Sequence, residues 1–198
     1  MRIPMIVLVA FAAVVLAQGS PAASSSCGSA LTLALQKADV PSTVQGSLFG
    51  PAKPHCKTAD ALRFIGTGLK GADYSYTWPV SGSTEKDWHL TGDVFVALNA
   101  PAAKKLFADG KAAQHGFFAD FGTEKAKPLT GLHYGDEQLG WVGPDAGGPQ
   151  AMVFVRRGAV VWELRIGHSP PAWKVTKAQV LTMLNTYAAK QKKRVGAG

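Results

Sequence analysis

Cys27 and Cys56 are the only cysteines of the chain, and their number limits the chemistry open to them. In an oxidising compartment, two cysteines in a small protein predict one disulfide bond. Two free thiols, or a lipid attached to Cys27, are the alternatives. His55 stands next to Cys56, a pairing that would suit a metal ion or an activated thiol. Zinc needs three or four ligands at recurring spacings, however, and the chain has no C-x-x-C or H-x-x-x-H motif. We therefore expect a disulfide and no metal.

Groups able to act as acids, bases or nucleophiles are scattered along the chain. The five histidines, at positions 55, 89, 115, 133 and 168, occur singly and outside serine-elbow or metal-ligand motifs. Asp136 and Glu137 are adjacent, but neighbours on a strand point to opposite faces and cannot flank a substrate as glycosidase carboxylates do. The sequence thus predicts no catalytic residue and no cofactor. A cluster assembled in space is the alternative, because distance along the chain does not exclude it.

Arg156 and Arg157 stand next to each other, and Gly158 follows them. The pattern predicts a hairpin whose glycine takes the left-handed position of a bulge turn. Alternation places the two arginines on opposite faces, so they cannot bind one anion together. We expect both to be exposed and to pair with carboxylates such as Asp136 or Glu137. Anion binding at the hairpin tip is the alternative, which keeps both as candidate binding residues.

An aromatic row, Tyr74, Tyr76 and Trp78, lies on one side of the strand predicted over 72–80. Such a row can stack sugars or apolar ligands, and it is the other candidate binding feature of the chain. Aromatic rows more often pack beneath a helix, which is the alternative interpretation.

The elements that position these residues follow from periodicity. A helix over 29–40 is capped by Ser29 and stopped by Pro41. A strand over 88–98 places Trp88, Leu90, Val94, Val96 and Leu98 on one face, with Gly92 as a candidate bulge. Asn99 caps a second helix, in which Gly110 and Gly116 favour a kink or a break.

The last third of the chain has the clearest pattern. A strand over 136–143 is followed by two strands that pair about Gly158. In the second of these, Val160, Trp162, Leu164 and Ile166 point inward, whereas Glu163 and Arg165 point outward. A closing helix begins at a Thr176–Gln179 capping box, with Val175 and Val180 as a hydrophobic staple. The order of helices and hairpins predicts an α+β protein with a single, mainly antiparallel sheet covered by helices, an α/β/α sandwich.

The N-terminus indicates the compartment. Arg2 precedes an apolar run over 3–17, and small and polar residues follow it. These are the three regions of a secretory signal peptide, and the run is shorter than the ~20 residues that a membrane span needs. We expect a signal peptide over 1–23, cleaved after Ala23, with an uncleaved anchor as the alternative. Ser24 stands where a bacterial lipobox has a leucine-like residue, which argues against lipidation.

Composition predicts one domain with a basic surface. Lysine and arginine total 21 against 13 acidic residues, a formal net charge of +8. This excess allows contact with acidic polymers, but the positive charges are scattered apart from the tail that begins at Lys190. We expect one domain over 24–189, a disordered basic tail over 190–198, no stable membrane span after signal cleavage and no nucleic-acid partner.

Three short motifs carry a resemblance that covers most of the mature chain. They are Asp39-Val40-Pro41, Gly135-Asp136-Glu137 and Val155-Arg156-Arg157-Gly158. Their order resembles a diffuse group of small secreted proteins, lipoproteins and receptor-kinase ectodomains of high-GC bacteria, although Ala159 stands where that pattern often has asparagine. The resemblance implies a PsbP/Mog1-like fold. For function it implies sensing, binding or envelope assembly and no particular chemistry.

From these observations we expect a secreted bacterial envelope protein that binds a small molecule or an envelope partner and does no chemistry. A secreted hydrolase with a spatially assembled site is one alternative. The other is a structural protein whose basic tail holds it on acidic cell-wall polymers. The residue set behind this expectation comprises the disulfide cysteines Cys27 and Cys56 and the candidate binding residues Tyr74, Tyr76, Trp78, Arg156 and Arg157.

Overall fold

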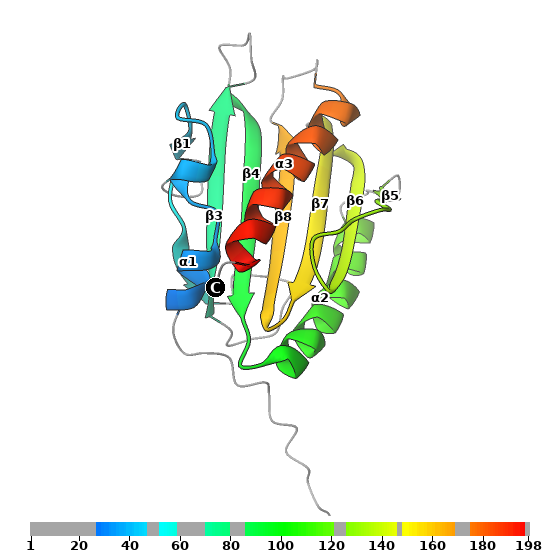
Figure 1. The fold of residues 1–198 in the computed structure, drawn as a ribbon. Coiled ribbons are helices and arrows are strands. Elements are labelled where there is room, and N and C mark those ends of the chain that lie inside the picture. The colour runs from blue at the N-terminus through cyan, green and yellow to red at the C-terminus, as the bar shows by residue number, and fades with distance from the viewer. Residues whose placement is uncertain are drawn as a thin grey trace, which may run out of the picture.

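The computed structural model of the chain describes residues 27–46, 52–58, 70–79, 86–120, 126–145, 148–168 and 175–196. In these residues the strands form one antiparallel sheet, with α-helices packed on it (Figure 1). The predicted signal peptide over 1–23 lies outside the described residues. None of the described helices combines the length and apolar character that a membrane span requires.

The sheet is built from hairpins joined through its centre. Its path runs β1-β3-β4-β8-β7-β6-β5, and β2 pairs with β3 beside that path. The strands are β1 (Gln45–Gly46), β2 (His55–Thr58), β3 (Lys70–Pro79), β4 (Lys86–Val96), β5 (Lys127–Pro128), β6 (Glu137–Asp145), β7 (Gly148–Arg157) and β8 (Val160–His168). The hairpins β3–β4 and β6–β7–β8 connect neighbours in sequence, whereas β4 and β8 come together from distant parts of the chain.

Different helices cover the two faces of the sheet, because side chains alternate along each strand. The helical elements are α1 (Gly28–Leu33), the 3₁₀ turn η1 (Lys37–Asp39), α2 (Ala100–Asp120) and α3 (Lys177–Gly196). α1 and α3 pack on the face that holds Trp162 and Leu164, whereas α2 packs on the other face, against Phe154 and Val161. Figure 1 shows α3 in front of β8 and α2 behind the sheet. The α/β/α arrangement predicted from the order of elements is therefore observed.

Burial confirms the register predicted for β8. Trp162, Leu164 and Ile166 are all fully buried in the larger core. Removing an apolar side chain of this size from water contributes roughly 1.5–3 kcal/mol. Gly158 in the β7–β8 turn has the predicted positive φ, 57°. The predicted bulge is absent, because Arg157 pairs directly with Val160 across a two-residue turn.

Two of the three predicted helix caps are present. The Asn99 side chain accepts a hydrogen bond from the Ala102 amide at 2.9 Å at the start of α2. At α3, the Gln179 amide donates to Thr176 Oγ1 at 3.2 Å, and the Thr176 amide donates to Gln179 Oε1 at 2.7 Å. Val175 and Val180 of the predicted staple are both buried. Capping groups satisfy amides that the first turn leaves without partners, which is why the sequence locates these ends.

The first helix is shorter than predicted. α1 ends at Leu33, and Gln36 adopts an extended conformation before η1 begins. The Gln36 side-chain amide donates to the carbonyl oxygens of Leu31 and Ala34, so it satisfies groups that a continuing helix would have used. The N-cap also lies two residues earlier than expected, at Cys27 rather than Ser29.

Two predictions for β4 are wrong. Gly92 is not a bulge, since β3 and β4 pair in unbroken register around it. A β-carbon there would lie 2.2 Å from the Tyr74 hydroxyl oxygen, so glycine is required by close approach. Leu98 was expected on the inward face but is 65% exposed, because β4 ends at Val96 and the alternation ends with it.

Glycine does not break α2, which runs without interruption through Gly110 and Gly116. A β-carbon at Gly110 would lie 2.5 Å from the Phe154 ring, so this glycine lets the helix approach β7. The expectation that Glu163 points to solvent is also wrong, since the residue is only 6% exposed.

The basic tail expected to be disordered from Lys190 is helical through Gly196. Its order has a visible cause, because Tyr187, Gln191 and Val195 follow one another at the four-residue spacing of one helix face, and all three are buried. These three residues are separated by lysines and an arginine, which made the segment resemble a disordered basic tail in the sequence.

Candidate functional site

Cys27 and Cys56 form the predicted disulfide, with their Cα atoms 5.6 Å apart and a sequence separation of 29. It joins the start of α1 to β2 at the edge of the sheet. Neither sulfur is therefore available to bind a metal or to act as a thiol. Within the described residues, moreover, no group of three or more His, Cys, Asp or Glu side chains is arranged to hold a metal ion.

The aromatic row belongs to the core. Tyr74, Tyr76 and Trp78 share one face, as predicted, but they are 1%, 0% and 5% exposed. The Trp78 ring packs against that of Tyr187 on α3, with their centroids 5.5 Å apart. Burial raises the pKa of Tyr74 and of Tyr76 well above that of a free tyrosine. These rings consequently lie under helices and do not present a surface on which a ligand could stack.

Arg156 stabilises the β7–β8 turn. Its Nη1 lies 3.0 Å from Asp136 Oδ2 and its Nε 2.5 Å from Glu137 Oε2, the two carboxylates with which pairing was expected. The amide of Gly158 also donates to Asp136, at 2.8 Å. The side chain is only 13% exposed, which corrects the expectation of an exposed arginine. Arg156 is thus occupied by contacts within the protein.

Arg157 points to the opposite face and reaches α3. Its Nη1 donates to the carbonyl oxygen of Lys192 at 3.2 Å. Together with Ala189, Lys192, Lys193 and Gly196, it lines a shallow cavity of about 420 Å³, which we call the basic pocket. The hairpin tip and the C-terminal end of α3 thus bring cationic groups from two elements to one place.

The two lysines that line the basic pocket differ in their contacts with the rest of the protein. Lys192 Nζ donates to the carbonyl oxygen of His133 at 2.6 Å, and Lys193 is exposed. Elsewhere on α3, Arg194 pairs with Asp39. Among the described residues, the pocket lining includes three cationic side chains and no acidic one. Lysines in the last turns of α3 are explained in part by the negative end of the helix dipole. The dipole does not explain Arg157, which belongs to β7.

The basic pocket was only partly visible in the sequence. Arg157 was a candidate because it stands at a hairpin tip, but Lys192 and Lys193 were assigned to a disordered tail. The signal that could have found them is the four-residue spacing of Tyr187, Gln191 and Val195, which places residues 192 and 193 on a folded helix.

A histidine and a carboxylate also meet at β2 and β3. His55 Nε2 lies 3.1 Å from Asp73 Oδ1, and Ser75 follows Asp73 on the same face of β3. Hydrolytic triads require the serine hydroxyl to hydrogen-bond to the histidine. Ser75 Oγ has no hydrogen-bond partner in the described part of the chain, so these residues do not form a triad.

Comparison with known proteins identified no similar protein. No family model, curated protein or solved structure matches the chain.

Proposed function

We propose that the protein is a secreted, non-catalytic binding module of the bacterial envelope, and that its basic pocket holds an anionic group of the partner. The observation that carries this proposal is the convergence of Arg157, Lys192 and Lys193 on one cavity from two separate elements. A phosphate or carboxylate of an acidic envelope polymer is the partner chemistry that suits it. We also assign the sandwich to the PsbP/Mog1-like group, on the motifs around Asp136 and Arg156.

The arrangement favours an anion for physical reasons. A guanidinium group offers several N–H donors in a fixed plane, and Arg157 uses only Nη1 in the contact with Lys192. Lys193 can rotate toward a bound anion because its side chain is exposed. The excess of positive charge, +8 in the full chain and one less without Arg2 of the predicted signal peptide, would attract a polyanion from a distance. The basic pocket would then select where it binds.

Charge-neutralising variants test the proposal, with long-chain inorganic polyphosphate as the probe and isothermal titration calorimetry as the measurement. The double variant Arg157→Gln, Lys193→Gln should weaken binding about tenfold or more, since a hydrogen bond to a charged group contributes roughly 1.5–3 kcal/mol. Its binding should also depend less steeply on salt, because fewer counterions are exchanged.

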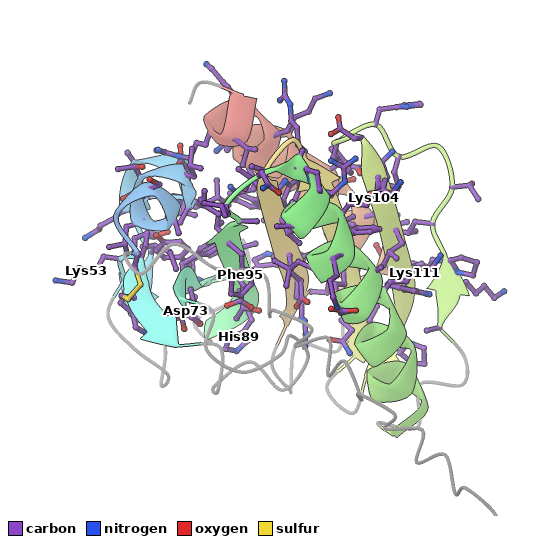
Figure 2. The ribbon with its side chains drawn as sticks, turned by 90° about the horizontal axis from the view of Figure 1, so that it is seen from below. Lys53, Asp73, His89, Phe95, Lys104 and Lys111 are labelled. Carbon is purple, nitrogen blue, oxygen red and sulfur yellow. A yellow bond between two sulfur atoms is a disulfide. The ribbon has the colours of Figure 1, made fainter. Side chains whose placement is uncertain are left out.

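The matched control is Lys104→Gln, Lys111→Gln, which makes the same change in net charge on α2 (Figure 2). Both lysines are exposed, so this variant should weaken binding by no more than about twofold. Equal weakening by the two double variants would show that polyphosphate responds to overall charge, and the basic pocket would then not be a site. Poly-L-glutamate in place of polyphosphate separates carboxylate from phosphate recognition.

A further inference from the structure

Cationic side chains continue from the basic pocket across the outward surface of α3 to η1. Lys190 lies three residues before Lys193 in the helix, so the two side chains are neighbours on its surface, and both are exposed. The Lys190 ammonium group donates in turn to the carbonyl oxygen of Asp39 in η1. Lys37, at the start of η1, is also exposed. We call the basic pocket together with Lys190 and Lys37 the basic track.

Three elements from distant parts of the chain build the basic track. On one side of α3, Arg157 Nη1 donates to the carbonyl oxygen of Lys192 at 3.2 Å, which holds the β7–β8 turn against the helix. On the other side, Arg194 forms an ion pair with Asp39, which holds η1 against the helix. Figure 1 shows the C-terminal end of α3 between α1 and the end of the sheet where β7 joins β8. Contacts with the folded protein thus fix the backbone that carries these cations on both sides of the helix.

The carboxylates beside the basic track are already engaged. The Asp39 carboxylate accepts a hydrogen bond from the Gln36 amide at 2.7 Å and also pairs with Arg194. At the other end of the track, Asp136 lies 3.0 Å from Arg156 Nη1. These two acidic residues therefore neutralise arginines outside the basic track and leave its own lysines without a carboxylate from this part of the surface.

The stability of α3 does not account for the positions of these lysines. In the described part of the chain, Lys37, Lys190 and Lys193 form no ion pair with a carboxylate. Like charges on neighbouring positions of a helix surface, such as Lys190 and Lys193, destabilise it slightly. The helix dipole favours cations in the last turn, which includes Lys193 but neither Lys190 nor Lys37. A bound anion would compensate this repulsion.

Exposed cations spread over three elements favour a ligand that carries several negative charges. A single exposed ion pair contributes little, because water and salt screen it. A polymer held at one part of the basic track, however, presents its next anionic group to the other part at a high effective concentration. Phosphate suits these donors, since its oxygens can accept from the planar guanidinium group of Arg157 and from lysine ammonium groups at the same time.

We propose that the basic track binds one linear chain of repeated phosphate groups, with one phosphate in the basic pocket and another beside Lys190 and Lys37. This inference rests on the proposed function, because the basic pocket supplies the first contact. It adds the class of partner, a polymer of phosphate groups rather than an isolated anion. It also adds the path of that polymer, which crosses α3 from the β7–β8 turn to η1.

Two probes of different length test the proposal. Long-chain inorganic polyphosphate is measured by isothermal titration calorimetry, and orthophosphate, a single anionic group, is measured by ¹H–¹⁵N NMR titration. The double variant Lys37→Gln, Lys190→Gln should weaken polyphosphate binding about tenfold, because the second part of the track is lost. The slope of log affinity against log salt should become shallower by about 1–2. Orthophosphate binding in the basic pocket should stay within about twofold of that of the wild-type protein.

Lys104→Gln, Lys111→Gln on α2 is again the matched control, and it should change polyphosphate binding by no more than about twofold. Thermal unfolding of each variant verifies that it is folded. Equal polyphosphate affinities of the Lys37, Lys190 variant and the α2 variant would overturn the basic track, as would an equal loss of affinity for both probes. If Arg157→Gln, Lys193→Gln still weakened polyphosphate binding in either case, the proposed function would stand without the track.

Discussion

Hydroxyl and amide groups buried in the core join the sheet to two helices. The Tyr74 hydroxyl donates to Gln191 Oε1 at 3.1 Å, and Gln191 Nε2 donates to the carbonyl oxygen of Leu33 at 2.7 Å. The Tyr76 hydroxyl donates to the carbonyl oxygen of Leu35, also at 2.7 Å. Alternation in the sequence predicted that the tyrosines share a face. Their role depends on Gln191, which is more than a hundred residues away, and local pattern does not reveal such a partner.

Tyr187 should make stability fall at alkaline pH. Burial raises its pKa from 10.0 to about 12 in the folded protein, whereas in the unfolded chain it ionises near its ordinary value. Between these values the unfolded state releases a proton that the folded state retains, so the free energy of unfolding decreases as pH rises. Urea unfolding at a series of pH values should show this decrease, and Tyr187→Phe should make it shallower.

The contribution of Tyr74 and Tyr76, whose pKa values are also raised, should remain in Tyr187→Phe. Identical pH slopes for the variant and the wild-type protein would mean that Tyr187 ionises as readily in the folded state as in the unfolded one.

At the scale of elements, sequence patterns predicted the turns and helix ends that depend on residues close together in the chain. The β7–β8 hairpin, the Asn99 cap and the Thr176–Gln179 capping box all depend on residues close in sequence, and all are observed. The end of α3 was misjudged because its basic residues resemble those of a disordered tail. Its stripe is stabilised by contacts with β7, β8 and α1, which lie far away along the chain.

Gly158 allows a clean test of the hairpin. Its φ of 57° lies in the left-handed region, and an added β-carbon would meet nothing within 4 Å. Any loss of stability on substitution therefore reports backbone strain rather than a clash. Gly158→Val should lower the free energy of unfolding by about 1–3 kcal/mol, as measured by urea denaturation.

Gly158→Asn is the matched variant, since asparagine tolerates the left-handed region better than a β-branched residue does. It should lose clearly less stability than Gly158→Val. Equal losses would indicate that the turn fails for a reason other than the conformation of its backbone.

At the scale of the whole molecule, the basic pocket exists only because a strand and a helix from distant parts of the chain meet. Lys193 reaches Arg157 because α3 packs along β7. The pairing of β4 with β8 likewise places Asp93 opposite Glu163. In the sequence, Asp73, Asp93 and Glu163 lie in three separate strands, and only Glu163 was predicted to point outward. Only the order of strands in the sheet reveals that they form one row.

The disulfide should stabilise the fold as a whole, because it fastens β2 at the edge of the sheet to the start of α1. A crosslink between cysteines 29 residues apart restricts the unfolded chain, and chain entropy predicts a contribution of about 3–4 kcal/mol. The double variant Cys27→Ser, Cys56→Ser should lose that amount in urea unfolding.

Reductant supplies the control for this measurement. It should destabilise the wild-type protein to the level of the serine variant and should leave the serine variant unchanged. If the wild-type protein and the serine variant unfolded at the same urea concentration under oxidising conditions, the disulfide would contribute nothing to stability.

The pairing of β4 with β8 also affects the order in which parts of the sheet form during folding. β3–β4 and β6–β7–β8 are hairpins that can close locally, but the seam between them aligns Val96 with Val160. Closing so long a segment costs entropy before any contact across the seam is gained. Two hairpin units with exposed edges should therefore form early and persist until the seam closes, a topology that slows folding relative to proteins with local contacts. The strand pairing that joins the two halves of the sheet would thus be completed in the slowest step of folding.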